Sequence, residues 1–270
     1  MPNQFTHPWE IEEINFLKEN ITKLTYKQMG IVINRSPSSI QSKIRYLPIQ
    51  AKVKKHNVNS DFFKTWSPEM AYILGFIGAD GNVCHSGRGY ILHVACDDKD
   101  IIEKIKPILS YGGPIYEKTR DNGKTSYSLR ICDQAIFNDL IKLGITERKS
   151  LTLTPPKIPK NLSRHFIRGY FDGDGSVSFR NTSYKSKLVV DFYTASQPMS
   201  KFLHWEIKQL LKNSYHGKVR VVLKHQKKPY YRINLGHKSA FKLFTYMYDG
   251  VNLYLERKYN KFIKGLNYGN

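Results

Sequence analysis

One nine-residue pattern occurs twice in the chain and constrains its fold more than any other feature. Residues 73–81 read ILGFIGADG, and residues 167–175 read IRGYFDGDG. Both copies combine apolar residues with a central glycine and end in Asp-Gly, and every matched position is offset by 94 residues. A pattern repeated at a fixed distance predicts two copies of one structural unit.

Each copy is predicted to be a helix that ends at its acidic residue. Ser67, which is followed by proline and glutamate, supplies a side-chain cap, a preset φ and a negative charge for the first turn. We expect Ser163 to cap the second helix in the same way. Gly81 and Gly175 follow the acidic residues and are predicted to end the two helices.

Each predicted helix carries small residues four positions apart, which places them on one face. Such a stripe allows two helix backbones to approach closely. If the two helices pack on each other, Asp80 and Asp174 would lie side by side at one end of the pair. The stripes consist of Gly75 with Ala79 and of Gly169 with Gly173.

Two adjacent carboxylates suit a divalent cation such as Mg²⁺ or Mn²⁺. Mg²⁺ is commonly held by one or two carboxylates together with phosphate oxygens and water, and paired metals stabilise the attacking and leaving oxygens in phosphodiester hydrolysis. A single Asp-Gly pair is an ordinary helix-ending turn. Two pairs at a fixed offset favour a metal site formed by Asp80 and Asp174.

From about residue 66 onward, the doubled motif resembles the LAGLIDADG homing endonuclease family in its single-chain form. The resemblance implies an α+β fold of two pseudo-symmetric αββαββα repeats, whose antiparallel sheets form a saddle over the DNA major groove. It also implies that Asp80 and Asp174 are the catalytic, metal-binding acids. An earlier acidic position of the family motif is Asp172 here but Gly78 in the first copy. Because this position is not the principal metal ligand, we expect both halves to be active.

The family also places a basic residue near the scissile phosphate, just ahead of the last helix of each repeat. Lys238, with His237 as an alternative, matches this position in the second repeat and is expected to be catalytic. The first repeat has Cys132 and Asp133 there, so such a role would be asymmetric.

The strongly basic composition predicts a polyanionic partner. The 270 residues include 43 Lys and Arg but 22 Asp and Glu, a formal net charge of +21, and neutralising phosphates releases counterions. The 18 tyrosines favour nucleic acid over a membrane surface, and a basic solubilising surface is the alternative. With this composition, the family resemblance implies double-stranded DNA with a long asymmetric target, bound by a monomer that needs no protein partner and no membrane.

The three cysteines lack CxxC spacing, which predicts reduced thiols in an intracellular compartment. The cytoplasm of a bacterium or of a phage-infected cell, or an organelle, would fit. No apolar run reaches transmembrane length, and the N-terminus lacks a signal-peptide pattern. The family resemblance implies a mobile intron or an intein, but the sequence does not identify the host element.

Residues 1–50 are predicted to form a small three-helix domain, with helices over residues 9–20 and 24–33 and a third that starts at Ser36 and Pro37. It resembles a Myb-like or helix-turn-helix module, whose third helix enters the major groove. A bundle that merely caps the catalytic domain is the alternative. The predicted core residues are Trp9, Ile11, Ile14, Phe16, Leu17, Tyr26, Met29, Ile31, Val32, Ile40, Ile44 and Leu47. The predicted DNA contacts are Gln41, Lys43 and Arg45.

The rest of the chain is divided into four segments. A basic linker is expected to follow the phosphate backbone or to act as a solvated tether, and a proline-rich connection joins the two repeats. A Glu-Arg-Lys triplet at residues 147–149 and again at 256–258 indicates that whole units are doubled. The segments are residues 51–65 for the linker, 66–150 for the first repeat, 151–162 for the connection and 163–270 for the second repeat.

The predicted strands alternate so that basic and polar side chains share one face, which suits a DNA groove. In the first repeat the strands cover residues 82–85, 90–95, 114–120 and 125–131, and in the second residues 176–180, 187–194 and 218–224, followed by a strand that contains residues 230–234. The expected DNA contacts on these strands are Lys118, Arg120, Arg130, Arg180, Lys218, Arg220, Lys224 and Arg232.

These features together predict a site-specific, metal-dependent endonuclease that cuts both DNA strands. Two other classes stay open, a catalytically inactive DNA-binding regulator and an RNA-binding intron-splicing maturase on the same fold. The presence of both acids argues against the inactive regulator. The helix-turn-helix-like module favours duplex DNA over RNA.

Overall fold

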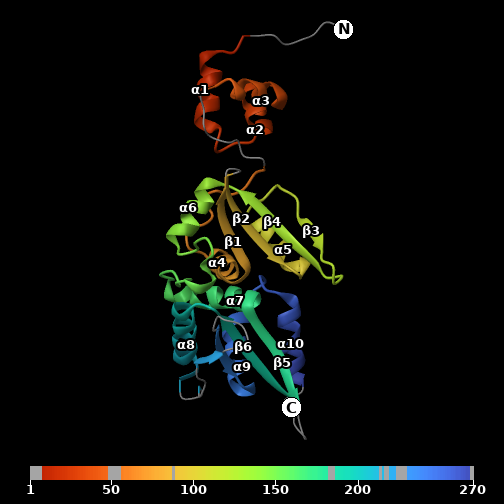
Figure 1. Ribbon diagram of the computed structural model, residues 1–270, viewed down its shortest axis with the longest axis vertical. Coiled ribbons are helices and arrows are strands. Elements are labelled where there is room, and N and C mark those ends of the chain that lie inside the picture. The colour runs from red at the N-terminus through yellow and green to blue at the C-terminus, as the bar shows by residue number, and fades with distance from the viewer. Residues whose placement is uncertain are drawn as a thin grey trace.

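The computed structural model describes residues 8–47, 56–86, 89–181, 186–212, 215, 219–222 and 230–267. A small helical module precedes two α+β units of the same construction, which meet at a central pair of helices (Figure 1). The predicted fold class is therefore confirmed. No helix in these ranges combines the length and apolar character needed to cross a bilayer.

The N-terminal module consists of α1 (Ile11–Asn20), α2 (Tyr26–Ile33) and α3 (Pro37–Arg45). Leu17, Met29 and Ile40 form its own core, separate from that of the two repeats. The prediction that Ile11, Ile31 and Val32 are core residues is wrong, since they are 72%, 75% and 61% exposed. Each short helix packs through one narrow face, and these residues lie off it. Ile44 and Leu47 pack against the core as predicted.

The first repeat runs α-β-β-α-β-β-α, and the second has the same order with one further helix. The first contains α4 (Pro68–Asp80), β1 (Gly81–Ser86), β2 (Gly89–Cys96), α5 (Lys99–Ile108), β3 (Tyr116–Thr119), β4 (Thr125–Cys132) and α6 (Gln134–Lys142). Two short 3-10 turns follow, η1 (Lys149–Leu151) and η2 (Lys160–Leu162). The second contains α7 (Ser163–Asp174), β5 (Gly175–Asn181), β6 (Ser186–Thr194), α8 (Gln197–Leu211), β7 (Val219–Val222), β8 (Tyr230–Leu235), α9 (His237–Tyr248) and α10 (Glu256–Asn267). Helix α10 was not predicted.

The two four-stranded antiparallel sheets have matching orders, β1-β2-β4-β3 and β5-β6-β8-β7. Alternation gives each sheet two different faces. One face carries the buried side chains that pack against helices, such as Leu92 and Leu129 in the first sheet and Val190 and Ile233 in the second. The opposite face, called the open face below, carries the polar side chains that alternate with them.

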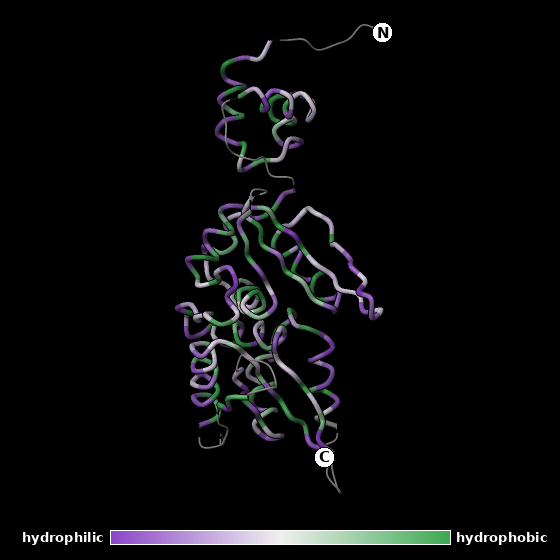
Figure 2. Tube along the Cα trace, viewed as in Figure 1, coloured by the Kyte–Doolittle hydropathy of each residue, from purple (hydrophilic) through white to green (hydrophobic). Residues whose placement is uncertain are grey.

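Helices α4 and α7 pack backbone against backbone at the hydrophobic centre of the molecule (Figure 2). A Cβ atom on Gly75 would overlap the carbonyl oxygen of Phe166 and lie 2.9 Å from the backbone nitrogen of Tyr170. A Cβ atom on Gly169 would overlap the carbonyl oxygen of Tyr72. The predicted seam of small residues is therefore confirmed, because only glycine permits this approach.

The two seam helices begin differently. The Ser67 hydroxyl accepts a hydrogen bond from the backbone nitrogen of Met70 at 3.1 Å, as predicted. The prediction that Ser163 caps α7 is wrong, because Ser163 is the first residue of that helix and Leu162 precedes it without a side-chain cap. The η2 turn leads directly into α7 and leaves no extended capping position. The Ser163 hydroxyl instead donates to Glu206 at 3.4 Å.

Replacing Gly75 or Gly169 with alanine should lower the stability by about 1–3 kcal/mol, because the added methyl group meets backbone that cannot move independently. The measurement is urea unfolding at pH 7. Gly78→Ala is the matched control on the same helix, since its Cβ would lie at ordinary contact distances of 3.6–3.9 Å. This control should be neutral or slightly stabilising, because alanine favours the helix. Equal effects at all three positions would contradict the backbone contact.

Candidate active centre and nucleic-acid interface

The structure brings the two predicted acids together at one end of the seam. Helix α4 ends at Asp80 and α7 ends at Asp174. A Cβ atom on Gly173, the residue before Asp174, would lie 3.4 Å from Oδ2 of Asp80. Burial, and then the charge of Asp80, raises the pKa of Asp174 to about 6. Two carboxylates that repel each other in this way are suited to share a cation.

Gly81 and Gly175 end the helices as predicted, but in extended conformation, with φ of −81° at both. Their requirement for glycine comes from space, since a Cβ atom on Gly81 would lie 2.7 Å from Ile77 and one on Gly175 would overlap the ring of Phe171. Each helix therefore passes directly into the first strand of its sheet. This places both acids where the first strand of each sheet begins.

Two buried lysines, which the sequence reasoning missed, lie beside the acids. Lys149 and Lys258 are 6% and 4% exposed. The ammonium group of Lys258 donates to the carbonyl oxygens of residues 171–173 at 2.7, 2.7 and 3.0 Å, at the end of α7. The ammonium group of Lys149 donates to the carbonyl oxygen of Gly81, at the end of α4. The two lysines therefore cap the helix ends that carry the acids.

The lysines and the acids are electrostatically linked. Burial lowers the pKa of both lysines, that of Lys258 to about 8, while the carboxylates of Asp80 and Asp174 act in the opposite direction. Each lysine is the last residue of a repeated Glu-Arg-Lys triplet. The triplet indicates that whole units are doubled, and the lysine repeated at matching places within it is the sequence signal for this buried pair.

The predicted catalytic residue Lys238 lies elsewhere. It is exposed in the first turn of α9, and its neighbour His237 accepts a hydrogen bond from the backbone nitrogen of Leu188 at 3.2 Å. Leu188 pairs with Phe179, which is four residues beyond Gly175 and therefore about 13 Å along the strand. The buried lysines lie nearer the acids, and a catalytic role of Lys238 stays a prediction.

Asp172 has a structural environment that explains the difference from Gly78. It is 1% exposed and accepts hydrogen bonds from the Tyr72 hydroxyl at 2.8 Å, the Tyr248 hydroxyl at 2.6 Å and the backbone nitrogen of Leu255 at 2.9 Å. It thus connects α7 with α4, α9 and the segment that leads into α10. A glycine at the matching position of the first repeat removes this connection without removing an acid from the end of the seam.

The open faces hold most of the predicted DNA-contacting side chains that the structure describes. Lys118 and Arg130 are exposed on the first sheet, and Arg180 and Arg220 on the second. Arg120 follows β3, and its guanidinium donates to Asp97 at 2.9 Å. Lys218 and Lys224 lie outside the described residues.

The remaining predicted contacts are Arg232 and the residues of α3. Arg232 lies on the open face of the second sheet, but its guanidinium is hydrogen-bonded to Asp191. Gln41 and Arg45 are exposed on α3. Lys43 is half-buried, with its ammonium group 5.7 Å from the centre of the Trp9 ring.

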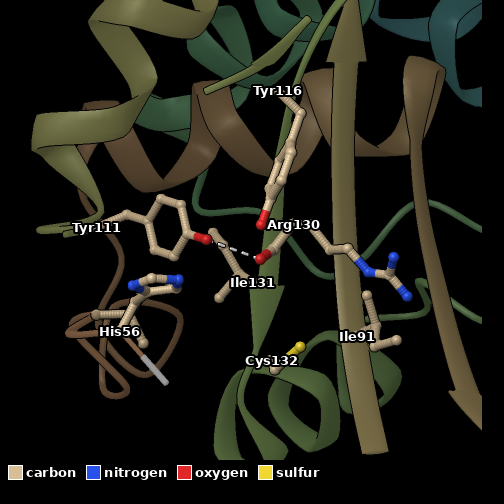
Figure 3. Close-up of a pocket in the computed structure, with 8 residues that line it drawn as sticks. His56, Ile91, Tyr111, Tyr116, Arg130, Ile131 and Cys132 are labelled. Carbon is tan, nitrogen blue, oxygen red and sulfur yellow. Dashed lines mark hydrogen bonds between the residues drawn. The ribbon is translucent and has the colours of Figure 1, made fainter. Parts of the chain in front are cut away.

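The chain enters the first repeat beside the connection between α5 and β3. The backbone nitrogen of Gly112 donates to the carbonyl oxygen of Asn57, and that of Asn59 donates to Leu109, both at 2.9 Å. A hollow of about 260 Å³ lies beside this segment, between His56, Tyr111 and Tyr116 (Figure 3). The linker therefore ends against the first sheet and away from the second.

A divalent cation fits the two acids. In the described part of the chain, no three His, Cys, Asp or Glu side chains gather as a metal site. A cation between Asp80 and Asp174 would therefore take its other ligands from phosphate oxygens and water, which is the usual environment of Mg²⁺.

Residues 67–143 and 161–246 match the family described as the LAGLIDADG-like domain. The match covers more than half of the chain and both copies of the repeated motif. The chain belongs to this family.

Two curated relatives come from Methanocaldococcus jannaschii. The chain is 28% identical over 187 residues to a probable translation initiation factor IF-2 and 27% identical over 128 residues to an uncharacterized protein. These alignments cover 66% and 46% of this chain. They span 15% and 45% of the relatives' own lengths.

Similar solved structures include the homing endonuclease I-WcaI bound to its DNA recognition sequence, with a TM-score of 0.45 and 14% identity, covering 82% of this chain and 96% of that one. The LAGLIDADG meganuclease I-AabMI bound to uncleaved DNA has a TM-score of 0.47 and 13% identity, covering 75% and 90%.

Asp172→Asn should lower the free energy of unfolding by about 1–3 kcal/mol, because an amide cannot accept all three hydrogen bonds and leaves a buried donor unpaired. Urea unfolding at pH 7 measures the effect. Tyr72→Phe and Tyr248→Phe each remove one donor and should cost less than the aspartate change. A fully stable Asp172→Asn variant would show that the carboxylate does not connect the helices.

Proposed function

We propose that the chain is a site-specific DNA endonuclease that hydrolyses one phosphodiester bond in each strand with Mg²⁺ or Mn²⁺. The observation that carries the proposal is the meeting of Asp80 and Asp174 at the shared end of α4 and α7. Membership of the LAGLIDADG-like family supports it. So does the net charge of +21, because phosphate contacts dominate DNA affinity.

The chain's own residues have distinct roles in this proposal. Asp80 and Asp174 would hold the cation, which activates water and stabilises the charge that develops on phosphate. Lys149 and Lys258 are buried and keep positive charge fixed beside the acids, where it would oppose the negative charge that develops on phosphate. Glycines hold all four groups in place by permitting the close helix contact.

The two open faces would read different half-sites, which accords with a long asymmetric target. Their registers match, so that His93 and Arg130 of the first sheet occupy the places of Asp191 and Asn234 in the second. Burial and the charge of Arg130 lower the pKa of His93, which favours its neutral form. One sheet thus presents a cation at a place where the other presents an amide.

The N-terminal module would contact DNA beside the half-site of the first sheet. Residues 57–59 are hydrogen-bonded to the connection between α5 and β3 of the first repeat, and the eight residues 48–55 can span at most about 29 Å. The exposed polar side chains of α3, among them Gln41 and Arg45, would make the contacts. A module held on this side extends the target in one direction only.

The match to a small fraction of a translation factor favours a mobile element. The aligned segment occupies 15% of that relative, a share that suits an inserted element such as an intein. Whether this chain comes from an intein, an intron or a free-standing gene is decided by sequencing its genomic flanks.

The full-length chain should cut a subset of a duplex DNA library in Mg²⁺, and EDTA should abolish the cutting. Asp80→Asn and Asp174→Asn should each abolish double-strand cleavage while DNA affinity stays within about tenfold, because basic groups supply most of the binding. Sequencing of cleaved ends and binding isotherms measure both effects. Lys238→Met, measured in the same way, tests the separate prediction that Lys238 is catalytic.

The outcomes separate the possible functions. Double-strand cutting by either Asn variant would rule out the two-acid mechanism. Specific binding without cutting would indicate a regulator, and preferential binding of intron RNA would indicate a maturase.

A chain that starts at His56, and so keeps the docked segment, should still cut but with a footprint shortened on the first sheet's flank alone. Its affinity should also fall less steeply with salt, because phosphate contacts are lost. Footprinting and binding isotherms at two salt concentrations measure this. In the full chain, Gln41→Ala with Arg45→Ala should weaken protection on the same flank. Unchanged footprints, or loss on both flanks, would contradict the assignment.

A further inference from the structure

A buried carboxylate lies on the open face of the second sheet, where the proposed function places DNA. Asp191 is 3% exposed. It accepts hydrogen bonds from Nε and Nη2 of Arg232 at 2.7 and 2.8 Å, and from Nδ2 of Asn234 at 2.6 Å. An acidic group on a surface that binds a polyanion opposes binding, so its presence calls for a specific reason.

The pairing leaves one edge of the arginine unused. Asp191 occupies the side of the guanidinium formed by Nε and Nη2, and no group in the described part of the chain bonds Nη1. The Arg232 side chain remains 35% exposed, and its guanidinium carbon lies 5.9 Å from the centre of the Tyr193 ring. The guanidinium is therefore fixed on one side while its terminal edge, formed by Nη1 and Nη2, stays available.

This arrangement favours guanine as the ligand of the free edge. Two parallel N–H groups of an arginine match the O6 and N7 acceptors of guanine in the major groove. A guanidinium already fixed by a carboxylate loses little side-chain entropy when it binds, whereas an unpaired arginine can turn to a nearby phosphate.

The hydrogen bond from Asn234 helps to exclude a direct contact between Asp191 and a base. Asp191 alone could accept a hydrogen bond from the amino group of cytosine. With three hydrogen bonds from Arg232 and Asn234 on its two oxygens, however, it is buried and occupied. The carboxylate therefore acts on the arginine and does not read a base itself.

We propose that Arg232 reads one guanine in the second half-site and that Asp191 is the positioning residue that aligns it. The proposal rests on the proposed function, since it requires duplex DNA on the open face. Asp191 pairs with Ser176, two residues after Asp174, so the guanine lies in the inner part of the half-site. The first sheet has His93 and Ser128 at the places of Asp191 and Arg232, so its half-site lacks this contact.

The test is a binding-selection experiment with the full chain and duplexes randomised across the second half-site. Ca²⁺ replaces Mg²⁺ so that binding is measured without relying on cutting, and cutting in Mg²⁺ is recorded separately. The parent should prefer guanine at one inner position by roughly 5- to 150-fold, the discrimination expected of a bidentate contact.

Arg232→Lys keeps the positive charge and the ion pair but loses the two parallel N–H donors. It should therefore lose the preference for guanine at that position alone. Asp191→Asn should relax the same position without lowering overall affinity, because it removes a negative charge from the interface. Arg180→Ala is the matched control. It removes an exposed cation near the outer end of β5 and should weaken binding to all sequences with the guanine preference intact. Thermal melting confirms that each variant is folded.

An unchanged base preference in Arg232→Lys, or an equal loss of affinity for every sequence, would overturn the proposal and leave the nuclease function standing. Relaxation at several unrelated positions in Asp191→Asn would also overturn it, because that result indicates a general change of the sheet. A parent that binds and cuts no duplex would instead refute the proposed function. A folded Arg232→Lys variant decides the question even if Asp191→Asn does not fold.

Discussion

The close contact between α4 and α7 is the constraint on which the rest of the structure depends. Because Gly75 and Gly169 bring backbone against backbone, the two helices end at the same place, and Asp80 and Asp174 meet there. Helix C-termini carry partial negative charge. The contact therefore gathers two carboxylates and two negative helix ends at one point, an arrangement that is unfavourable unless positive charge compensates it.

Lys149 and Lys258 supply part of that compensation. Removing an ammonium group from water is costly, and burial lowers the pKa of both lysines. They remain acceptable inside because Lys258 donates to three carbonyl oxygens of the last turn of α7 and Lys149 donates to that of Gly81, just after α4. A lysine in this position stabilises the helix end and opposes the carboxylate charge at the same time. A divalent cation would complete the compensation, which links the stability of the seam to the proposed chemistry.

The sequence predicted those features that depend on local spacing. The repeated glycines and aspartates predicted the seam, and period-two alternation predicted the hairpins and their polar faces. Features that depend on contacts between distant segments were missed. The pairing of Arg232 with Asp191 depends on strand register, and the burial of Lys258 depends on how α10 returns to the seam. Helix α10 itself had an available signal, since Leu255, Tyr259, Phe262 and Leu266 follow a helical spacing.

The two repeats can differ in their open-face side chains more readily than in the glycines of the helix seam. A seam glycine contacts the backbone of the other repeat, so a change there displaces both halves at once. An open-face side chain such as Arg130 or Arg220 is exposed, and a change there would alter recognition without moving the scaffold. A symmetric dimer would have to repeat each recognition residue and would require a palindromic target. One chain that carries both repeats is free of that requirement, because each sheet can acquire its own side chains while the common seam keeps the two acids in register.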